Sequence, residues 1–262
     1  MLDKLWPTLV RMREQRPLVQ NITNYVVMNS TANALLSLGA SPAMVHAPDE
    51  VEDFAAISGA LVVNIGTLSS EWVAGMKLAI TTAHDKQVPW ILDPVGVGAT
   101  RFRTRVAADL AKMGPAVIRG NASEVLALAG AASEGPKGVD STARAEDAES
   151  ASKAIAKELG TVVAISGATD IITDGERTVK LDDGHPMMPL VTGMGCTATA
   201  LIGAFLAVEA DPFLAAAYGL AALGVAGKRA GQAAPGPGSL QLGILDQLYG
   251  LSEENLKPTL GS

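Results

Sequence analysis

Short, almost uninterrupted apolar runs recur along the chain, and they limit its fold more than any other feature. The runs occupy residues 61–65, 88–92, 116–118 and 161–165. Continuous rather than alternating apolarity indicates strands that are buried on both faces, as in a parallel sheet covered by helices. Helical segments separate the runs, which predicts strand–helix–strand units with right-handed crossovers and therefore an α/β fold.

The remaining pattern predicts the helices and the edges of the sheet. Gly39 is expected to end the second helix, since glycine readily takes the left-handed conformation of a helix C-cap. A turn signal between two short strands in residues 171–179 predicts an antiparallel hairpin at the sheet edge. Two further strands are expected at 18–21 and 41–45, and helices at 3–15, 26–38, 50–58, 70–86, 146–159, 196–208, 212–230 and 239–251.

The composition is that of a globular protein with a large core. Hydrophobic residues make up 48% of the 262 residues and charged residues 18%, which argues against a disordered chain. The net charge of −7 argues against nucleic acid as a main partner. The sequence shows neither an internal repeat nor a linker, so we expect a single domain over residues 1–262.

The cellular location is predicted from the same features. The first residues lack the charged-then-apolar pattern of a signal peptide. The most apolar stretch, residues 198–227, is interrupted by two acidic residues and a proline, which favours two buried helices over a membrane span. We therefore expect a soluble, cytoplasmic protein that does not enter the membrane.

The only cysteine follows a Gly-x-Gly turn, in the stretch from Gly193 through Met194 and Gly195 to Cys196. Small apolar residues come next, which predicts a buried helix with Cys196 in its first turn. Free N–H groups and the helix dipole favour a phosphate at such an N-terminus, and the dipole is expected to lower the pKa of the thiol. We expect an anion site that carries a base or a nucleophile, although a purely structural cysteine also fits the pattern.

Polar residues follow several predicted strands, at the edge where open parallel sheets bind ligands. Asp93 and Arg119 come directly after apolar runs, and Asn121 and Glu124 stand where a helix would begin. Structural alternatives exist, because Asp93 can cap a turn and Asn121 with Glu124 fits a capping box. As ligand groups they match phosphoryl transfer from a magnesium nucleotide, with Arg119 on phosphate and the two carboxylates on Mg²⁺.

In that reaction the turn would serve the transferred phosphoryl group. The backbone amides of Gly195 and Cys196 would stabilise it, and the thiol would take the proton of the acceptor hydroxyl. Nucleophilic catalysis by the thiol is the alternative, but it normally requires a histidine partner, and the three histidines occupy no diagnostic position. The sequence contains no Gly-x-x-x-x-Gly-Lys-Ser/Thr pattern and is therefore not a P-loop enzyme.

Two side chains near the start of the chain leave a choice between packing and binding open. Asn24 lies between a strand and a helix, where asparagine often caps the helix but can also contact a ligand. Met44 stands inside a predicted strand, where methionine normally packs into the core.

Six motifs agree, in order and spacing, with one known family. They lie at residues 20–27, 39–44, 64–68, 93–96, 119–124 and 191–196. Through them the chain resembles hydroxyethylthiazole kinase, a thiamine-salvage family of the ribokinase-like superfamily. The resemblance implies a three-layer α/β/α ribokinase-like fold with a mostly parallel sheet and an antiparallel edge hairpin. It also implies phosphorylation of 4-methyl-5-(2-hydroxyethyl)thiazole by ATP with Mg²⁺, in a homotrimer whose thiazole sites lie between subunits.

The resemblance implies a role for each candidate residue. Cys196 stands where sugar kinases of the superfamily carry an aspartate base, which makes it the catalytic residue. The other implied roles are thiazole binding for Met44, Asn24 and Gly193, nucleotide binding for Arg119, Ser166, Asn121 and Gly195, and metal binding for Asp93 and Glu124.

Two positions depart from the family pattern. Met194 replaces a small residue between the two glycines, so we expect its longer side chain to narrow the site or alter the choice of substrate. Ser166 replaces a common threonine but keeps the hydroxyl group. A surface loop is expected at residues 131–145, and the sequence does not decide whether this loop closes over the nucleotide.

Three other functions remain open on the sequence alone. Another ribokinase-like vitamin or small-molecule kinase and a nucleotide-dependent dehydratase of a cofactor hydrate share the superfamily. A catalytically silent binding protein on the same fold is the third. Cys196, after the second glycine, argues against most other ribokinase-like kinases and dehydratases. A catalytically silent protein should have lost some of its active-site residues, and this chain keeps the full set Asp93, Arg119, Glu124 and Cys196.

Overall fold

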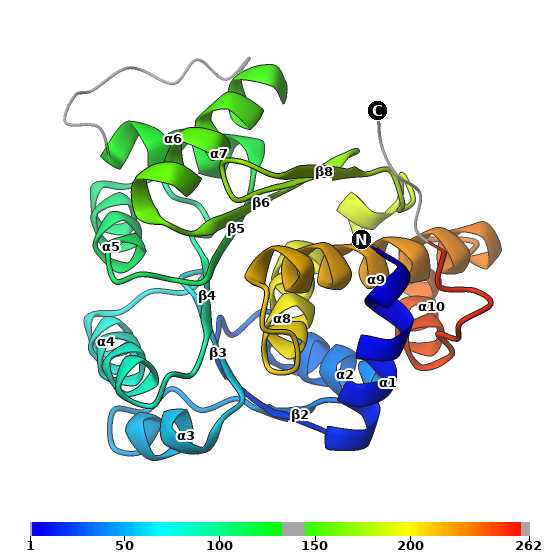
Figure 1. Ribbon diagram of the computed structural model, residues 1–262, viewed down its shortest axis with the longest axis horizontal. Coiled ribbons are helices and arrows are strands. Elements are labelled where there is room, and N and C mark those ends of the chain that lie inside the picture. Colours follow the sequence, from blue (N-terminus) through cyan, green and yellow to red (C-terminus); the bar gives the residue numbers. More distant parts are fainter. Residues whose placement is uncertain (1, 133–144, 258–262) are drawn as a thin grey trace.

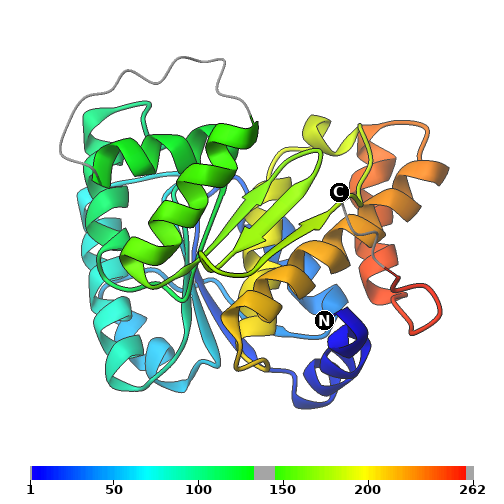
Figure 2. The same ribbon diagram turned by 45° about the horizontal axis from the view of Figure 1, so that its top comes forward.

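The computed structural model describes residues 2–132 and 145–257, and they form three layers. One sheet runs through the middle with helices on both faces (Figure 1, Figure 2). The apolar side chains of the two sheet faces fill two separate cores, one beneath each layer of helices. This arrangement confirms the three-layer α/β/α ribokinase-like fold that the sequence predicts.

All described strands join one sheet, in the order β2-β1-β3-β4-β5-β6-β7-β8. The strands from β2 to β6 pair in parallel, whereas β7 and β8 are antiparallel at one edge, which confirms the predicted hairpin. The bounds are β1 Leu18–Ile22, β2 Ser41–Ala43, β3 Ala60–Asn64, β4 Trp90–Asp93, β5 Val117–Asn121, β6 Val162–Ser166, β7 Asp170–Thr173 and β8 Thr178–Leu181.

The helices divide between the two faces of the sheet. One layer consists of α1 Leu5–Gln15, α2 Met28–Leu38, α8 Met194–Leu206, α9 Pro212–Ala233 and α10 Pro237–Tyr249. The other consists of α3 Val51–Ile57, α4 Ser70–Asp85, α5 Arg101–Ala111, α6 Ala122–Ala132 and α7 Ala145–Leu159. Two short 3₁₀ helices, η1 Leu2–Lys4 and η2 Met188–Leu190, complete the described elements. None of the described helices has the length and apolar character needed to cross a membrane.

The strand order reverses between β1 and β3. Strand β1 pairs with β2 on one side and with β3 on the other. The helix that follows β1, α2, lies on one face of the sheet, and the helix that follows β2, α3, lies on the opposite face (Figure 1). Such a reversal opens a crevice at the carboxyl ends of the strands, where open α/β sheets bind ligands.

Small residues allow helix α8 to lie close over the centre of the sheet. A Cβ built on Gly203 would come within 2.6 Å of Val62 Cγ2 on β3, and one built on Gly219 of α9 would come within 2.7 Å of Ile202. Larger residues at either glycine would push α8 away from β3 or from α9. The glycines therefore set the height of α8 above the sheet, and with it the position of the turn at its N-terminus.

The predicted elements occur, with ends that differ by a few residues. Helix α5, residues 101–111, is the main element that the sequence does not predict. In the structure Thr100 caps this helix by accepting a hydrogen bond from the Arg103 N–H group at 3.2 Å. Of the loop expected at 131–145, only the ends are described, and these belong to α6 and α7.

Candidate active site

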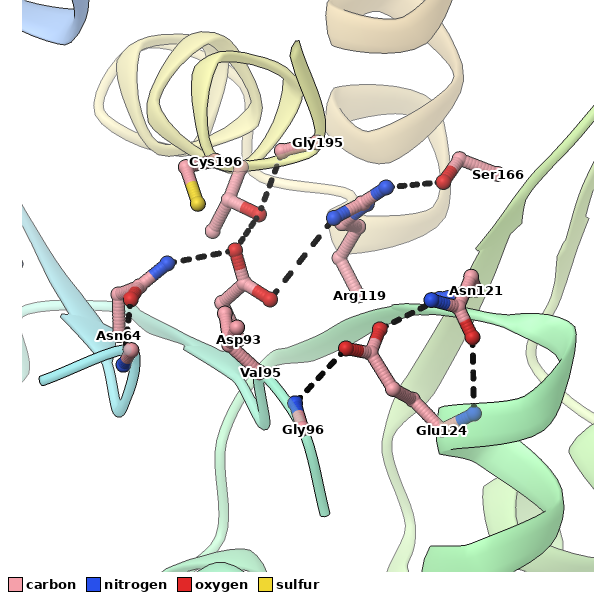
Figure 3. Close-up of polar contacts among 12 residues, drawn as sticks. Asn64, Asp93, Val95, Gly96, Arg119, Asn121, Glu124, Ser166, Gly195 and Cys196 are labelled. Atoms are coloured by element: carbon pink, nitrogen blue, oxygen red, sulfur yellow. Dashed lines mark hydrogen bonds and ion pairs between the residues drawn. The ribbon is translucent and has the colours of Figure 1, made fainter. Parts of the chain in front are cut away.

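The carboxyl ends of five neighbouring strands meet the N-terminus of α8. Figure 3 shows side chains from β3, β4, β5 and β6 pointing toward one another beneath this helix, with Cys196 and Gly195 above them. Gly193 is the N-cap of α8 and has a φ of 83°, in the left-handed region that favours glycine. The predicted turn therefore begins the helix, and Cys196 lies in its first turn.

Arg119 joins the helix turn to two strands. It is 6% exposed, its Nη1 lies 3.8 Å from Asp93 Oδ1, and its Nη2 donates a hydrogen bond to Ser166 Oγ. A Cβ on Gly195 would lie 2.7 Å from Arg119 Nη2. The guanidinium thus fills the space that a side chain at position 195 would need, and Nε has no hydrogen-bond partner within the described residues.

Asp93 is fully buried at the end of β4. Its Oδ2 accepts hydrogen bonds from Asn64 Nδ2 and Thr199 Oγ1, both at 2.8 Å, while Oδ1 has no hydrogen-bond partner in the described part of the chain. Burial raises the pKa of Asp93 to about 6, although Arg119 opposes the shift. The side chain does not cap the following turn, so that structural alternative is wrong.

Glu124 and Asn121 form the capping box that the sequence predicts. Glu124 N donates to Asn121 Oδ1 and Asn121 N donates to Glu124 Oε2, both at 2.9 Å. Glu124 Oε1 also accepts the Gly96 N–H group at 2.9 Å. The carboxylate therefore fixes the loop after β4 against the start of α6, in addition to any role toward a ligand.

Cys196 is a free thiol that faces Asn24 and Asp93. Asn24 Nδ2 lies 3.4 Å from Cys196 Sγ and is placed to donate a hydrogen bond to it. Burial, followed by the charge of Asp93, raises the pKa of the Cys196 thiol to about 11. The expectation that the helix dipole lowers this pKa is therefore wrong, because the thiol is desolvated beside a carboxylate.

Asn24 does not cap the helix that follows it. The N-cap of α2 is Val27, and no described side chain caps this end of the helix. Asn24 Nδ2 instead donates to Asn64 Oδ1 at 2.9 Å, in addition to its contact with Cys196. Met44 lies just after β2 and not inside the strand, because β2 ends at Ala43, and it is half-buried against the core under α8 and α9.

A cavity of about 630 Å³ opens beside the turn. Its wall includes all four residues predicted for the nucleotide, namely Arg119, Asn121, Ser166 and Gly195. Met194 also lines it. The thiazole candidates Asn24, Met44 and Gly193 and the carboxylates Asp93 and Glu124 are not on its wall.

Acidic side chains also line the same cavity. Asp170, Asp182 and Asp183 are all on its wall. Burial raises the pKa of Asp170 to about 6, and the charges of Asp183 and Asp182 add to the shift, whereas the charge of Arg119 opposes it. The cavity wall therefore carries both a guanidinium and three aspartates, and a phosphate group fits beside Arg119 rather than beside the aspartates.

Three residues of the site have no predicted role. Asn64 lies inside the run 61–65, and a polar residue near the end of such an apolar run is a usable signal. Thr199 lies inside an apolar helix and is fully buried, and Asp170 follows a short turn after β6. For these two, only the fold brings them to Asp93 and to the cavity.

The carboxylates of the site are candidate ligands for a divalent cation. Within the described ranges, no group of three or more His, Cys, Asp or Glu side chains is placed to hold a metal ion alone. Asp93 and Glu124 form a pair close enough that the charge of Glu124 helps to raise the pKa of Asp93. Mg²⁺ uses one or two carboxylates together with waters and substrate phosphates. The pair, with the unsatisfied Asp93 Oδ1, fits such an ion.

Comparisons of sequence give one consistent result. Residues 9–254 match a sequence model of the hydroxyethylthiazole kinase family. A hydroxyethylthiazole kinase of Granulibacter bethesdensis is 54% identical over 249 residues, which cover 95% of this chain and 90% of that protein. Another, of Syntrophus aciditrophicus, is 51% identical over 97% of this chain and 94% of its own length.

Solved structures agree with the sequence comparisons. A hydroxyethylthiazole kinase protein of Pyrococcus horikoshii superposes with a TM-score of 0.92 and is 41% identical, over 99% of this chain and 98% of that one. A pyridoxal kinase of Bacillus subtilis in complex with ADP reaches a TM-score of 0.62 at 20% identity, over 80% of this chain and 91% of that one. The second likeness shows a common fold.

Proposed function

The chain belongs to the hydroxyethylthiazole kinase family, and we propose how its site carries out the reaction of that family. The protein is a phosphotransferase that moves a phosphoryl group from ATP to the hydroxyl of 4-methyl-5-(2-hydroxyethyl)thiazole, a step of thiamine salvage. The observation that carries the proposal is the position of Arg119, between the Gly195 turn and Ser166 on the wall of the cavity.

The nucleotide occupies the cavity, with its phosphates toward the turn of α8. Arg119 and Ser166 bind phosphate oxygens, and the N–H groups at Gly195 complete the anion site at the helix N-terminus. Asn121, at the end of β5, lines the same cavity and also binds the nucleotide. This orientation is supported by the three aspartates on the cavity wall, which repel phosphate and offer acceptors to the base and ribose.

The two carboxylates would hold Mg²⁺ together with the phosphates. Glu124 would bind the ion directly or through water, and Asp93 would act through one of the ion's own waters. When bound, the ion neutralises the charge of the nucleotide phosphates. The chain itself orients the reactants, and the buried Asp93 and Arg119 exclude bulk solvent from them.

The acceptor alcohol lies on the side of Cys196 opposite the nucleotide. Asn24 and Met44 contact the thiazole ring, and Gly193 lies beside the hydroxyl. The thiolate form of Cys196 accepts the hydroxyl proton as the oxygen attacks the terminal phosphorus atom, and ADP leaves. This role is supported by the contact with Asn24 and by the place of the thiol at the helix N-terminus. Because the thiol pKa is raised to about 11, the thiolate is the minor form at neutral pH.

A homotrimer completes the thiazole site between subunits. Support comes from exposed apolar side chains on α2, η2 and α10, which adjoin one another, and on the segment just before α2. We call these residues the α2–α10 face. Its members, with exposed fractions, are Tyr25 67%, Val26 63%, Leu36 59%, Leu190 69%, Leu242 67% and Tyr249 77%. Exposed apolar area of this kind marks a protein interface. We assign the single kinase domain to residues 1–262 and place it in the cytoplasm, where ATP is available.

The direct test is ADP release in a coupled assay. The thiazole alcohol is compared with sugars and with hydroxymethylpyrimidine, each with ATP and Mg²⁺. The expected result is turnover that depends on the thiazole alcohol and is lost when the metal is chelated. Turnover with hydroxymethylpyrimidine or a sugar, but not with the thiazole alcohol, would assign the site to another kinase activity.

A further inference from the structure

We propose that Asn64 is a positioning residue of the kinase reaction, which holds the acceptor side of the site in register with the phosphoryl side. The inference rests on the proposed function above. It concerns a side chain for which that mechanism has no role. Asn64 ends β3, at the crevice where the strand order reverses.

The sheet register places Asn64 directly opposite Asp93, and the two side chains point to the same face. Asn64 Nδ2 donates to Asp93 Oδ2 at 2.8 Å. Asn64 Oδ1 accepts two hydrogen bonds at 2.9 Å, from Asn24 Nδ2 and from the Gly66 N–H group. Because donors face the oxygen and a carboxylate faces the nitrogen, only one orientation of the amide satisfies all three contacts.

An amide is the group that this position requires. Asn64, Asn24 and Asp93 are 1%, 4% and 0% exposed, so water is not available to replace a lost hydrogen bond. A carboxylate here would face Asp93 with like charge, and an apolar residue would leave a buried donor and acceptor without partners. The amide alone donates to one side and accepts from the other.

Asn64 connects the two halves of the reaction. On one side Asp93 faces Arg119 at 3.8 Å, which lies against the nucleotide cavity. On the other side Asn24 reaches Cys196 Sγ at 3.4 Å. Asp93 keeps Thr199 and Arg119 as neighbours when Asn64 is changed, whereas Asn24 loses the acceptor Asn64 Oδ1 and Cys196 loses its hydrogen bond with the Asn64 amide. The loss should therefore fall on the acceptor side.

The test compares Asn64→Ala, Asn64→Asp and Asn64→Gln with a matched control, Asn21→Ala. Asn21 is a fully buried asparagine on the neighbouring strand β1, whose Nδ2 donates to Val19 O at 2.9 Å. Wild type and variants are assayed for kcat and for the KM of ATP and of the thiazole alcohol, between pH 6 and pH 9. Melting temperature is recorded for each.

We expect Asn64→Ala and Asn64→Gln to lower kcat by roughly 10- to 100-fold, the scale of a misplaced reacting group, with a change of less than about threefold in the KM of ATP. For Asn64→Asp the deficit should shrink as the pH falls, because only a protonated carboxyl donates to Asp93. A residue that only supports the fold would lower the melting temperature and leave the kcat of the folded enzyme near that of wild type. Asn21→Ala should lower the melting temperature and leave kcat near that of wild type.

The unliganded protein gives a second measurement that does not depend on catalysis. The chain has one cysteine, so the rate of alkylation by iodoacetamide reports on Cys196 alone. We expect a severalfold change in Asn64→Ala and Asn64→Gln and none in Asn21→Ala. If wild type does not phosphorylate the thiazole alcohol, the proposed function fails, and alkylation still tests the contact. Folded Asn64 variants with wild-type kcat and alkylation rates would overturn the inference.

Discussion

The guanidinium of Arg119 lies against the backbone of Gly195, so closely that a Cβ at position 195 would come within 2.7 Å of Nη2. Position 195 therefore requires glycine because Arg119 occupies the space of a side chain there. The backbone of the turn does not impose this requirement, because its residue in the left-handed region is Gly193. The proposed phosphate site at this helix terminus thus depends on a side chain from β5 as well as on the backbone amides.

Gly195→Ala is expected to raise the KM of ATP and to lower kcat by at least tenfold. The added methyl group displaces Arg119 from Ser166 and from the cavity wall, and small displacements of positioning groups cost about 10²-fold. Steady-state kinetics with ATP as the varied substrate measures the effect.

Gly238→Ala is the matched control for that substitution. Gly238 is exposed in the first turn of α10, and a Cβ there has no described atom within 4 Å. Kinetics should be those of wild type, and stability should rise slightly because alanine favours a helix. Equal kinetic effects of the two substitutions would show that Arg119 does not depend on Gly195.

The residues proposed for the nucleotide can be predicted from the sequence for a physical reason. Asn121 and Ser166 are the last residues of β5 and β6, and Arg119 lies within β5. Parallel strands bring their carboxyl ends to one edge whatever the exact register. The same logic explains the correct prediction of the capping box at Glu124, which uses only local spacing. Thr199 is different, because its contact with Asp93 depends on how α8 crosses β4, which no local pattern encodes.

The pH dependence of kcat should follow the ionisation of Cys196. Because burial raises the pKa of this thiol to about 11, the thiolate fraction grows about tenfold for each pH unit below that value. We expect kcat to rise with pH from 6 to 9 in wild type. Cys196→Ala should lower kcat by roughly 10²-fold or more and flatten the profile. A steep profile in Cys196→Ala would assign the titration to another group.

Asp170→Asn is expected to stabilise the protein at neutral pH. Burial raises the pKa of Asp170 from 3.8 to about 6, so the folded state binds more protons than the unfolded state between these values. Its contribution to stability is therefore complete below about pH 4 and is lost as the pH rises through 6. Thermal melts should show a higher melting temperature for Asp170→Asn at pH 7.5 and almost none of this gain at pH 4.5.

Asp211→Asn supplies the opposite sign under the same conditions. Hydrogen bonds from Arg177 hold the pKa of Asp211 below its ordinary value, so the charged form contributes stability at neutral pH that is lost on acidification. The melting temperature of Asp211→Asn should fall at pH 7.5. Parallel shifts in the two variants would show that burial of Asp170 is not the cause of its effect.

Cys196 and Asn24 show where local reasoning about a site fails. The helix dipole predicts a lowered thiol pKa, but the thiol lies beside the carboxylate of Asp93 from another strand, and desolvation outweighs the dipole. Asn24 has the sequence context of a helix cap, yet its amide turns to Asn64 and Cys196. In both cases the deciding neighbour is distant in sequence.

Leu36→Glu is expected to separate the proposed homotrimer. Leu36 is 59% exposed on α2, within the α2–α10 face, and a buried unpaired carboxylate there would oppose association. Light scattering should give the monomer mass, and the KM of the thiazole alcohol should rise because the proposed thiazole site lies between subunits. Leu78→Glu, an exposed leucine on α4 at the opposite layer, should remain a trimer. A monomeric wild type would remove the inter-subunit site.

Gly203→Ala tests whether close packing of α8 holds the catalytic turn in place. The methyl group would lie 2.6 Å from Val62 Cγ2 in the centre of the sheet, and overpacking of this kind costs about 1–3 kcal/mol, more than the helix propensity gained. Urea unfolding should show this loss in Gly203→Ala.

Val62→Ala alone also destabilises the protein, because it leaves a cavity. The double variant should be more stable than the sum of the two losses predicts, because the new methyl group fills the space of the lost ones. Additive losses would mean that α8 can rise from β3, and kcat should then fall in Gly203→Ala as the turn moves with the helix.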